Sequence, residues 1–338
     1  MEIPNLRYVS SSSPGFIRKR KGKGFYYLDD KGERIRDEKI LERIEKLVIP
    51  PAWENVWICP YATGHLQATG IDTKGRKQYI YHPRWRKARE ETKYGNLLQF
   101  GKNLPLIRRQ VRKDLRKKTL QKEKVTAIAL AVMEETLIRV GNTYYANEYG
   151  SHGLTTLRNK HVSINGNTIS FRFRGKKGVL HEISYRDRKL ALLVKKIKEL
   201  PGQDLFQYYD QNGTLQNLGS GDINEYLSNC TQCNFTSKDY RTWAGTLHAL
   251  KEMAECPDFT TKEECEKNIV RIIDKVAAKL GNTRAVCRKY YIYPPLLEAY
   301  KRKQLSRFLK ALRKTSNSPE KFLKNEERIM LRLLKSNK

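Results

Sequence analysis

Hydrophobic and polar residues follow two different periods along this chain, and the change of period separates two domains. Strand-like alternation occurs at residues 25–28, 56–59, 65–71 and 77–81, with turns at 29–32 and 73–75. One helix interrupts these strands, and its apolar face carries Ile40, Leu41, Ile44 and Leu47. Before them, the polar and basic residues 1–24 predict a flexible arm. We therefore expect a small, mainly β domain over residues 25–90.

Helical spacing dominates the rest of the chain, which we place in a second domain of residues 91–338. Residues 125–140 are apolar enough for a buried helix, and residues 161–185 alternate as in a small antiparallel sheet with turns at 165–167 and 175–178. Helices follow from residue 186; one starts at a capping box of Thr261 and Glu264 and ends at Gly281. The predicted fold class is α+β, with a mostly α-helical second domain that carries the small sheet.

The formal charge of the chain is +31, because 67 Lys and Arg residues outnumber 36 Asp and Glu residues. This excess favours a polyanionic partner, and nucleic acid offers the densest array of phosphates. A basic protein that binds membranes is the alternative. The basic residues are spread along the whole chain, which favours a protein that encloses nucleic acid. Residues 107–124, with nine basic and two acidic side chains, form either a solvated helix face or a phosphate-binding surface.

The sequence contains no stretch that predicts a membrane span or an export signal. The longest apolar run, residues 125–133, is far shorter than the roughly 20 residues that cross a bilayer. The first residues lack the hydrophobic segment of a signal peptide. The 6 cysteines show no regular spacing, which is typical of reduced thiols in a reducing compartment. We expect a cytoplasmic protein without a membrane partner.

Several phosphate and metal sites are excluded by their residue patterns. Gly75 is followed by Arg76 and Lys77, where a P-loop needs Lys and then Ser or Thr. The pair Cys230-x-x-Cys233 has no second pair of the same spacing, and no close-spaced Asp/Glu cluster suggests a two-metal centre. We therefore expect no metal and no cofactor. Metal-free cleavage of a phosphodiester needs arginines for the phosphate, a proton donor for the leaving 5′-oxygen and a hydroxyl nucleophile.

Four segments of the second domain carry such residues in order along the chain. They read Leu-Ile-Arg-Val-Gly-Asn-Thr-Tyr-Tyr-Ala-Asn-Glu at 137–148, Phe-Arg-Gly-Lys-Lys-Gly at 173–178, Lys-Asp-Tyr-Arg-Thr-Trp at 238–243 and Gly-Asn-Thr-Arg-Ala-Val-Cys-Arg-Lys-Tyr-Tyr-Ile-Tyr-Pro at 281–294. In the first domain, residues 49–53, 64–70 and 75–81 add to the pattern. Together these segments resemble the type IB DNA topoisomerases of poxviruses and bacteria, and the resemblance extends from about residue 25 to residue 295.

The resemblance implies an enzyme that relaxes supercoiled DNA by transient cleavage of one strand, through a 3′-phosphotyrosyl intermediate, without ATP or a metal ion. Arg139 and Arg241 would bind the scissile phosphate, and Asn282 would donate to a non-bridging oxygen. Lys176 would be the general acid that protonates the leaving 5′-oxygen. Tyr291 would be the nucleophile.

Each of these residues also has an ordinary structural explanation. An arginine beside an apolar helix is often an ion-pair partner, Lys176 could be a turn lysine, and Tyr291 is one of 19 tyrosines. Asn282 matches bacterial members of the family, whereas poxvirus members have histidine at this position. Arg284 stands where proline is usual, and Tyr290 precedes the expected nucleophile where relatives usually have a small residue.

The resemblance also implies contacts with double-stranded DNA. Gln78, Tyr79 and Tyr81 match a segment that lies in the major groove, where glutamine can read an adenine edge. A sheet with surface tyrosines is the alternative for this segment. Tyr145 matches a further DNA-contacting position.

The predicted strand before the turn at 175–178 presents a basic face. Its alternation puts Arg172, Arg174 and Lys176 on the side opposite to Phe171 and Phe173, as expected of residues that face a DNA groove. The resemblance implies that the two domains form a clamp around duplex DNA. We expect a monomer that acts at the nucleoid of a bacterial cell.

Two other classes of DNA-binding protein are alternatives. A tyrosine recombinase shares the chemistry, but these enzymes usually have His-x-x-Arg at the second arginine, where this chain has Lys238-x-x-Arg241. A basic DNA-packaging protein without catalysis would need none of the four segments. Relaxation of a supercoiled plasmid in EDTA distinguishes these classes.

Overall fold

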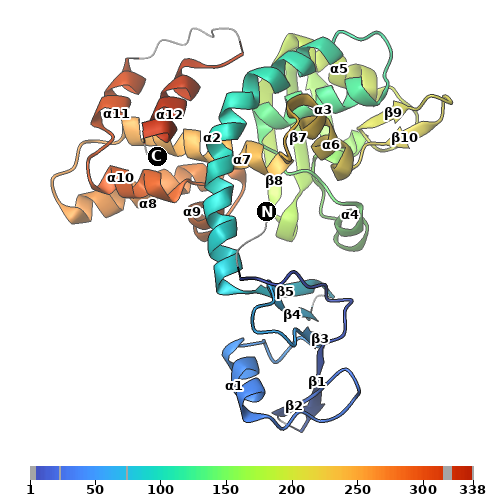
Figure 1. The fold of residues 1–338 in the computed structure, drawn as a ribbon. Helices are drawn as coiled ribbons and strands as arrows, with labels where there is room; N and C mark the ends of the chain where they lie inside the picture. Colours follow the sequence, from blue (N-terminus) through green and yellow to red (C-terminus); the bar gives the residue numbers. More distant parts are fainter. Residues whose placement is uncertain (1–4, 23, 74, 315–321, 337–338) are drawn as a thin grey trace. The chain divides into compact units, whose positions relative to one another are not determined.

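The chain divides into two compact units, residues 1–95 and 96–338, in a computed structural model (Figure 1). The structure describes residues 5–22, 24–73, 75–314 and 322–336, without the side chains of 87–95. Residues 1–4 and 23 of the expected arm, and Lys74 of an expected turn, therefore lie outside the described residues. Each unit has its own hydrophobic core. The fold class is α+β, as predicted.

The first unit is a five-stranded antiparallel sheet with the strand order β2-β1-β3-β4-β5. Its strands are β1 (Phe16–Lys21), β2 (Gly24–Leu28), β3 (Glu54–Ile58), β4 (Leu66–Ile71) and β5 (Lys77–Tyr81). The helix α1 (Glu38–Lys46) begins where the Asp37 side chain accepts a hydrogen bond from the backbone of Ile40. Its apolar face packs on the sheet, where Ile44, Val56 and Ile58 are buried.

The expectation of a flexible arm is wrong for residues 16–21, which form β1 near the middle of this sheet. A basic side chain provides part of the reason. Arg18 is buried and donates to the backbone oxygens of Ile49, Pro50 and Trp53, and its guanidinium carbon lies 4.1 Å from the centre of the Phe25 ring. At least one basic side chain of this segment therefore stabilises the folded sheet, and its basic composition was not a sign of disorder.

The second unit is mostly helical and carries a three-stranded antiparallel sheet of order β6-β7-β8. The sheet contains β6 (Val162–Asn165), β7 (Thr168–Arg174) and β8 (Leu180–Arg186), and a separate hairpin contains β9 (Gln207–Tyr209) and β10 (Leu215–Asn217). The helix α2 (Pro83–Asp114) begins in the first unit and continues into the second. The other helices of the second unit are α3 (Lys122–Thr136), α4 (Thr143–Tyr149), α5 (Arg188–Lys198), α6 (Ser220–Thr231), α7 (Ser237–Glu255), α8 (Lys262–Leu280), α9 (Arg284–Tyr290), α10 (Pro294–Lys301), α11 (Ser306–Arg313) and α12 (Asn325–Ser336). None of the helices in the described ranges is long and apolar enough to cross a membrane.

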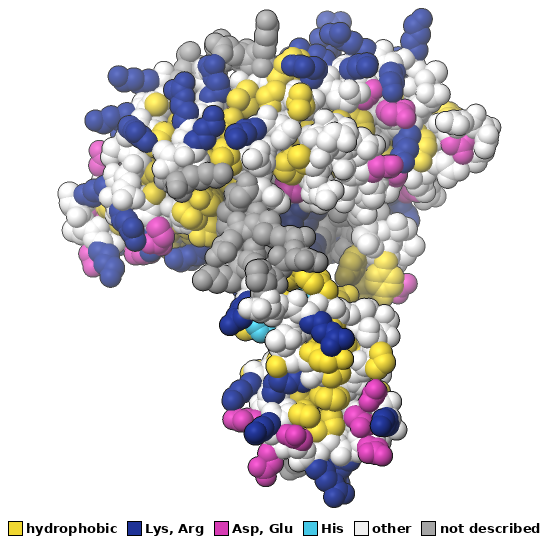
Figure 2. Space-filling model, viewed as in Figure 1, with side chains coloured by type: hydrophobic (Ala, Val, Ile, Leu, Met, Phe, Trp, Pro, Cys, Tyr) yellow, Lys and Arg dark blue, Asp and Glu magenta, His cyan; other side chains and the backbone are white. Residues whose placement is uncertain are grey.

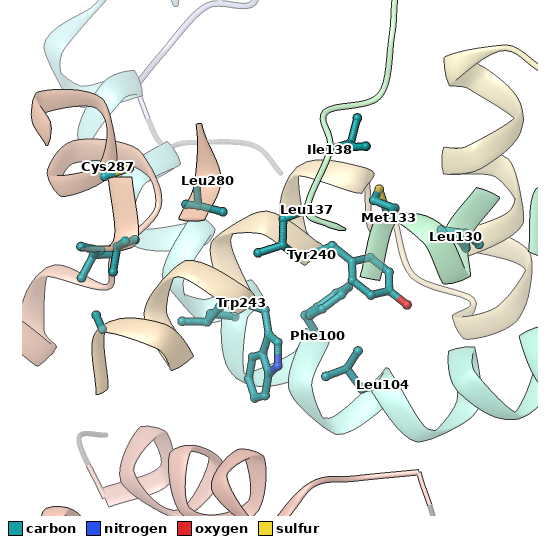
Figure 3. Packing of buried hydrophobic residues seen from close by; sticks show 14 of the residues in the cluster. Phe100, Leu104, Leu130, Met133, Leu137, Ile138, Tyr240, Trp243, Leu280 and Cys287 are labelled. Carbon is teal, nitrogen blue, oxygen red and sulfur yellow. The ribbon is translucent and has the colours of Figure 1, made fainter. Parts of the chain in front are cut away.

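Aromatic packing places α7 at the centre of this unit. The ring of Phe100 from α2 lies 5.0 Å from that of Tyr240 and 6.3 Å from that of Trp243, both on α7 (Figure 3). A Cβ atom at Gly101 would lie 2.2 Å from the Trp243 ring, so only glycine lets the two helices approach this closely. Arg241 lies between these two aromatic residues in the sequence and is therefore held on a rigid helix.

The helix α3 ends at Thr136, four residues before the predicted end at residue 140. Leu137 adopts a left-handed conformation, with φ of 56°, and its N–H donates to the carbonyl oxygen of Met133. The chain then continues without regular structure to residue 142. Arg139 consequently lies in the irregular segment after the helix and not in the helix itself.

Candidate active site

Arg241 is buried in α7 and donates to two backbone carbonyl groups. Its guanidinium binds the carbonyl oxygen of Leu137, at the C-terminal end of α3, and that of Leu280 at 2.8 Å, at the C-terminal end of α8. Helix C-termini carry partial negative charge, which favours a cation there. The Nε atom of Arg241 is buried and has no hydrogen-bond partner among the described residues.

Arg139 reaches the same helix end from the segment after α3. It donates to the carbonyl oxygen of Gly281 at 3.0 Å and to Oδ1 of Asn282. Gly281 closes α8 in the left-handed conformation, with φ of 57°, as the sequence predicted for a cap. In the part of the chain that is described, the buried Nδ2 of Asn282 has no hydrogen-bond partner. The side chain of Arg139 is thus held by the backbone of Gly281 and by Asn282, and Asn282 is held by Arg139.

Tyr291 lies directly beside Arg241, although 50 residues separate them in the sequence. It caps the C-terminus of α9, and its ring centre is 5.1 Å from the guanidinium carbon of Arg241. Burial by itself would raise the pKa of the Tyr291 phenol. The positive charge of Arg241 and a hydrogen bond from its side chain, followed by the charges of Arg139 and Lys238, outweigh burial and hold this pKa below its ordinary value. The phenolate is therefore easier to form here than on an ordinary tyrosine.

The neighbouring Tyr290 has a different environment. Its side chain is exposed, and the ammonium groups of Lys238 and Lys289 lie 5.9 and 5.4 Å from its ring. The guanidinium of Arg241 faces the ring of Tyr291. The two adjacent tyrosines therefore differ in the cations that they face.

Two residues of α7 that the sequence analysis did not select hold the backbone of Tyr291. The hydroxyl of Thr246 donates to the carbonyl oxygen of Tyr291 at 3.3 Å and accepts from the N–H of Tyr293 at 3.2 Å. A Cβ atom at Gly245 would lie 2.6 Å from the Tyr291 carbonyl oxygen. The signal in the sequence was the glycine itself, since glycine inside a helix often marks a close backbone contact.

Lys176 is exposed at the start of the turn between β7 and β8. The turn is tight: Gly175 donates its N–H to the carbonyl oxygen of Val179 at 2.8 Å, and Lys177 is in the left-handed conformation with φ of 65°. The alternation predicted for β7 is confirmed, because Phe173 is buried and Arg174 is exposed. Lys176 thus extends from a rigid support into solvent.

Of the remaining residues expected to contact DNA, Tyr79, Tyr145 and Arg172 are exposed, whereas Gln78 and Tyr81 are partly buried. Tyr145 is exposed on α4, and Arg172 on β7 forms an exposed ion pair of 2.9 Å with Glu182. In the first unit, the rings of Tyr79 and Tyr81 on β5 stack with centroids 6.0 Å apart. Gln78, the third residue of β5 that is expected to contact DNA, donates to a carboxylate oxygen of Asp72 at 2.8 Å.

The cysteines and acidic residues that the structure describes are not clustered as metal ligands. In the described ranges, no group of three or more His, Cys, Asp and Glu side chains is placed to hold a metal ion. Cys230 and Cys233 are partly buried against the core. Burial raises the pKa of the Cys230 thiol to about 11, so this thiol is protonated at neutral pH.

Comparison with known proteins identifies the family. The model for the catalytic core of eukaryotic DNA topoisomerase I matches residues 82–317, and the model for the N-terminal domain of bacterial DNA topoisomerase IB matches residues 24–72. The chain belongs to the type IB DNA topoisomerases. Its substrate is DNA, and neither a tyrosine recombinase nor a packaging protein is the right class.

Viral relatives of this topoisomerase align over most of its length. It is 33% identical over 334 residues to the DNA topoisomerase 1B of Acanthamoeba polyphaga mimivirus, with 95% of each chain covered. It is 24% identical over 289 residues to the DNA topoisomerase 1B of vaccinia virus strain Copenhagen, with 84% of this chain and 85% of the relative covered. The DNA topoisomerase I of monkeypox virus matches with the same identity and coverage.

Proposed function

We propose that this topoisomerase cuts one strand of duplex DNA by attack of Tyr291, holds the 3′-end as a phosphotyrosyl ester, and rejoins the strand after supercoils are released. The observation that carries the proposal is the placement of Tyr291 against Arg241, with the pKa of the phenol below its ordinary value. A tyrosine that is easily deprotonated is a better nucleophile. The ester conserves the energy of the phosphodiester bond, so rejoining needs no ATP.

Arg139, Arg241 and Asn282 would bind the non-bridging oxygens of the scissile phosphate. The transition state carries extra negative charge on these oxygens and is stabilised by donors that are already in place. Nε of Arg241 and Nδ2 of Asn282 support this role, because both are buried donors without an oxygen or nitrogen acceptor among the described residues, and the Asn282 side chain interacts only with the thiol of Cys287 on that side. A buried donor left unpaired costs about 1–3 kcal/mol, and a phosphate oxygen would remove that cost.

Lys176 would protonate the leaving group. Tyr291 first loses its phenol proton to solvent. As the phenolate oxygen bonds to phosphorus, the bond from phosphorus to the 5′-oxygen breaks, and a proton passes from the ammonium group of Lys176 to that oxygen, which leaves a neutral amine. Rejoining reverses each step: the 5′-hydroxyl gives its proton to the neutral amine of Lys176 and displaces Tyr291 as a phenolate. The reaction as written involves only side chains of this protein and no metal ion or cofactor.

We further infer where the enzyme meets DNA and where it works. Gln78, Tyr79 and Tyr81 would contact the major groove, and Tyr145, Arg172 and Arg174 would contact the duplex around the scissile phosphate. These residues come from both units, which supports a clamp around DNA formed by a monomer. The match of residues 24–72 to a bacterial N-terminal domain supports a bacterial enzyme that acts on chromosomal DNA in the cytoplasm.

The test is relaxation of a supercoiled plasmid in EDTA without ATP. We expect complete relaxation of positively and negatively supercoiled plasmid, because the proposed reaction uses only side chains of this chain. Gel electrophoresis of the topoisomers gives the result directly. Strict dependence on Mg²⁺ or ATP would overturn the metal-free mechanism.

Salt should weaken the complex steeply if the clamp encloses duplex DNA. Figure 2 shows Lys and Arg side chains distributed over the visible face of the larger unit and not gathered at one point. Each neutralised phosphate releases counterions, so log K falls against log salt with a slope near 0.9 per contact, and about six to ten contacts lower the affinity roughly 10³- to 10⁵-fold between about 50 and 200 mM salt. Equilibrium binding of a short duplex measures this slope. A slope near about two would show that most of the positive charge faces away from DNA, and it would contradict the clamp.

A further inference from the structure

One histidine that the proposed mechanism does not use lies between the turn that carries Lys176 and the end of α8 that precedes Asn282. His181 on β8 pairs with Phe173 on β7, and their rings stack with centroids 5.0 Å apart and an interplanar angle of 11°. The half-buried imidazole also lies against Gly175 and Gly281. These glycines directly precede the proposed general acid and the proposed phosphate-binding asparagine in the sequence.

The two glycines leave space for the imidazole because neither carries a side chain. A Cβ atom at Gly175 would lie 2.7 Å from Cδ2 and Nε2 of His181, and one at Gly281 would lie 2.3 Å from Cε1. Real Cβ atoms essentially never come within 3.0 Å of such neighbours. The Cδ2–Nε2 edge of the imidazole faces Gly175, and the Nδ1–Cε1 edge faces Gly281, where a Cβ atom would lie 3.0 Å from Nδ1. The ring is therefore a spacer in contact with both backbones.

The spacer joins two segments that come from different parts of the fold. On one side is the turn between β7 and β8, which begins with Lys176. On the other side is the cap of α8, where the carbonyl oxygen of Gly281 accepts from Arg139 and the chain continues to Asn282. A general acid must reach the leaving oxygen while the phosphate is held elsewhere, so the distance between these segments matters for the reaction.

We propose that His181 is a positioning residue that sets the distance between Lys176 and the phosphate-binding pair Arg139 and Asn282. This inference rests on the proposed function, because it takes Lys176 as the general acid. Packing defines the role, and the imidazole itself transfers no proton.

The electrostatic surroundings agree with a role of this kind. Burial, and after it the positive charges of Arg139 and Arg241, hold the pKa of His181 below its ordinary value. The ring is consequently neutral at neutral pH. It separates the two segments without adding a cation to those that bind the phosphate.

The test uses two duplex substrates, one with the normal bridging 5′-oxygen at the scissile phosphate and one with sulfur in its place. In His181→Ala we expect single-turnover cleavage of the oxygen substrate to slow by on the order of 10²-fold, which is the cost of a displacement of about 1 Å. Sulfur is a much better leaving group and needs little proton donation. Cleavage of the sulfur substrate should therefore stay within about threefold of wild type.

Matched variants separate packing from other effects. His181→Phe keeps a planar ring without a titratable nitrogen, and it should regain most of the lost rate on the oxygen substrate. Leu180→Ala changes an exposed neighbour on β8 and should leave both rates unchanged. Gly175→Ala disturbs the same contact from the turn, where φ of −97° permits alanine, and should reproduce the pattern of His181→Ala. This last variant keeps the inference testable if His181→Ala does not fold.

Equal slowing on both substrates, or no slowing in either His181→Ala or Gly175→Ala, would overturn the inference. Lys176→Ala in the same series distinguishes this failure from a failure of the proposed function. If Lys176→Ala is equally slow on both substrates, the general-acid assignment is wrong. If sulfur restores Lys176→Ala but not His181→Ala, the assignment stands and the positioning role of His181 is wrong.

Discussion

Replacing Tyr291 with phenylalanine will abolish relaxation and covalent attachment to DNA, while duplex binding stays close to that of wild type. The substitution removes one oxygen atom, which is the proposed nucleophile, and leaves the ring beside Arg241. Loss of a covalent nucleophile lowers the rate by on the order of 10⁴-fold or more. Plasmid relaxation, trapping of the adduct in denaturant and equilibrium binding measure the three properties.

Tyr290→Phe is the matched control, because it removes the same atom from the adjacent residue. Tyr290 is exposed and faces the lysines Lys238 and Lys289, and we expect its loss to change cleavage by less than about tenfold. If Tyr290→Phe were inactive and Tyr291→Phe active, the assignment of the nucleophile would be off by one residue. The proposed phosphate-binding groups would then have to be assigned again from Tyr290.

Lys176→Ala will slow cleavage of normal DNA by roughly 10²- to 10⁴-fold, which is the range typical of general acid catalysis. The leaving 5′-alkoxide is strongly basic, so its departure depends on a proton from a nearby donor. Lys176 is exposed in the turn that follows β7, so its removal leaves the core intact. Single-turnover cleavage of a substrate that cannot be rejoined gives the rate.

Sulfur at the bridging 5′-position tests the reason for that loss. The sulfur substrate should restore most of the rate of Lys176→Ala, because a thiolate leaves without protonation. Lys177→Ala, at the next position of the same turn, should cleave both substrates at nearly the wild-type rate. An equal defect of Lys176→Ala on both substrates would assign Lys176 to phosphate binding and not to proton transfer.

Local signals explain which parts of the fold could be predicted from the sequence. The capping box at Thr261 and the glycine at Gly281 lie at the observed ends of α8, and the alternation around Phe171 and Phe173 corresponds to β7. These features depend on residues that are neighbours along the chain. The small sheet and its turns at 165–167 and 175–178 were predictable for the same reason.

Contacts between distant segments explain the errors. The strand β1 depends on hydrogen bonds from Arg18 to residues 49–53, which composition does not reveal. The helix α3 was predicted too long because residues 137–140 are apolar apart from Arg139, whereas the left-handed turn at Leu137 is held by the surrounding structure. The short hairpin of β9 and β10 was missed, because strands of three residues carry almost no periodic signal.

In the candidate site, too, contacts between distant segments could not be predicted from local signals in the sequence. Arg139, Arg241, Asn282 and Tyr291 were selected through resemblance to a family, and the structure brings them together from segments that are far apart in sequence. Periodicity alone could not have grouped them. The supporting contacts of Gly245, Thr246 and His181 were not predicted, since each depends on a backbone that arrives from another element.

The carbonyl partners of the two active-site arginines bear on how a pH profile of cleavage should be interpreted. Arg139 and Arg241 donate to the backbone oxygens of Leu137, Leu280 and Gly281, and a carbonyl group has no acid form in water at any ordinary pH. Arginine likewise keeps its charge between about pH 5 and pH 9. The attraction for phosphate that these two side chains provide is therefore constant over this range. An inflection in the cleavage rate between these limits therefore reports the titration of a group other than these arginines.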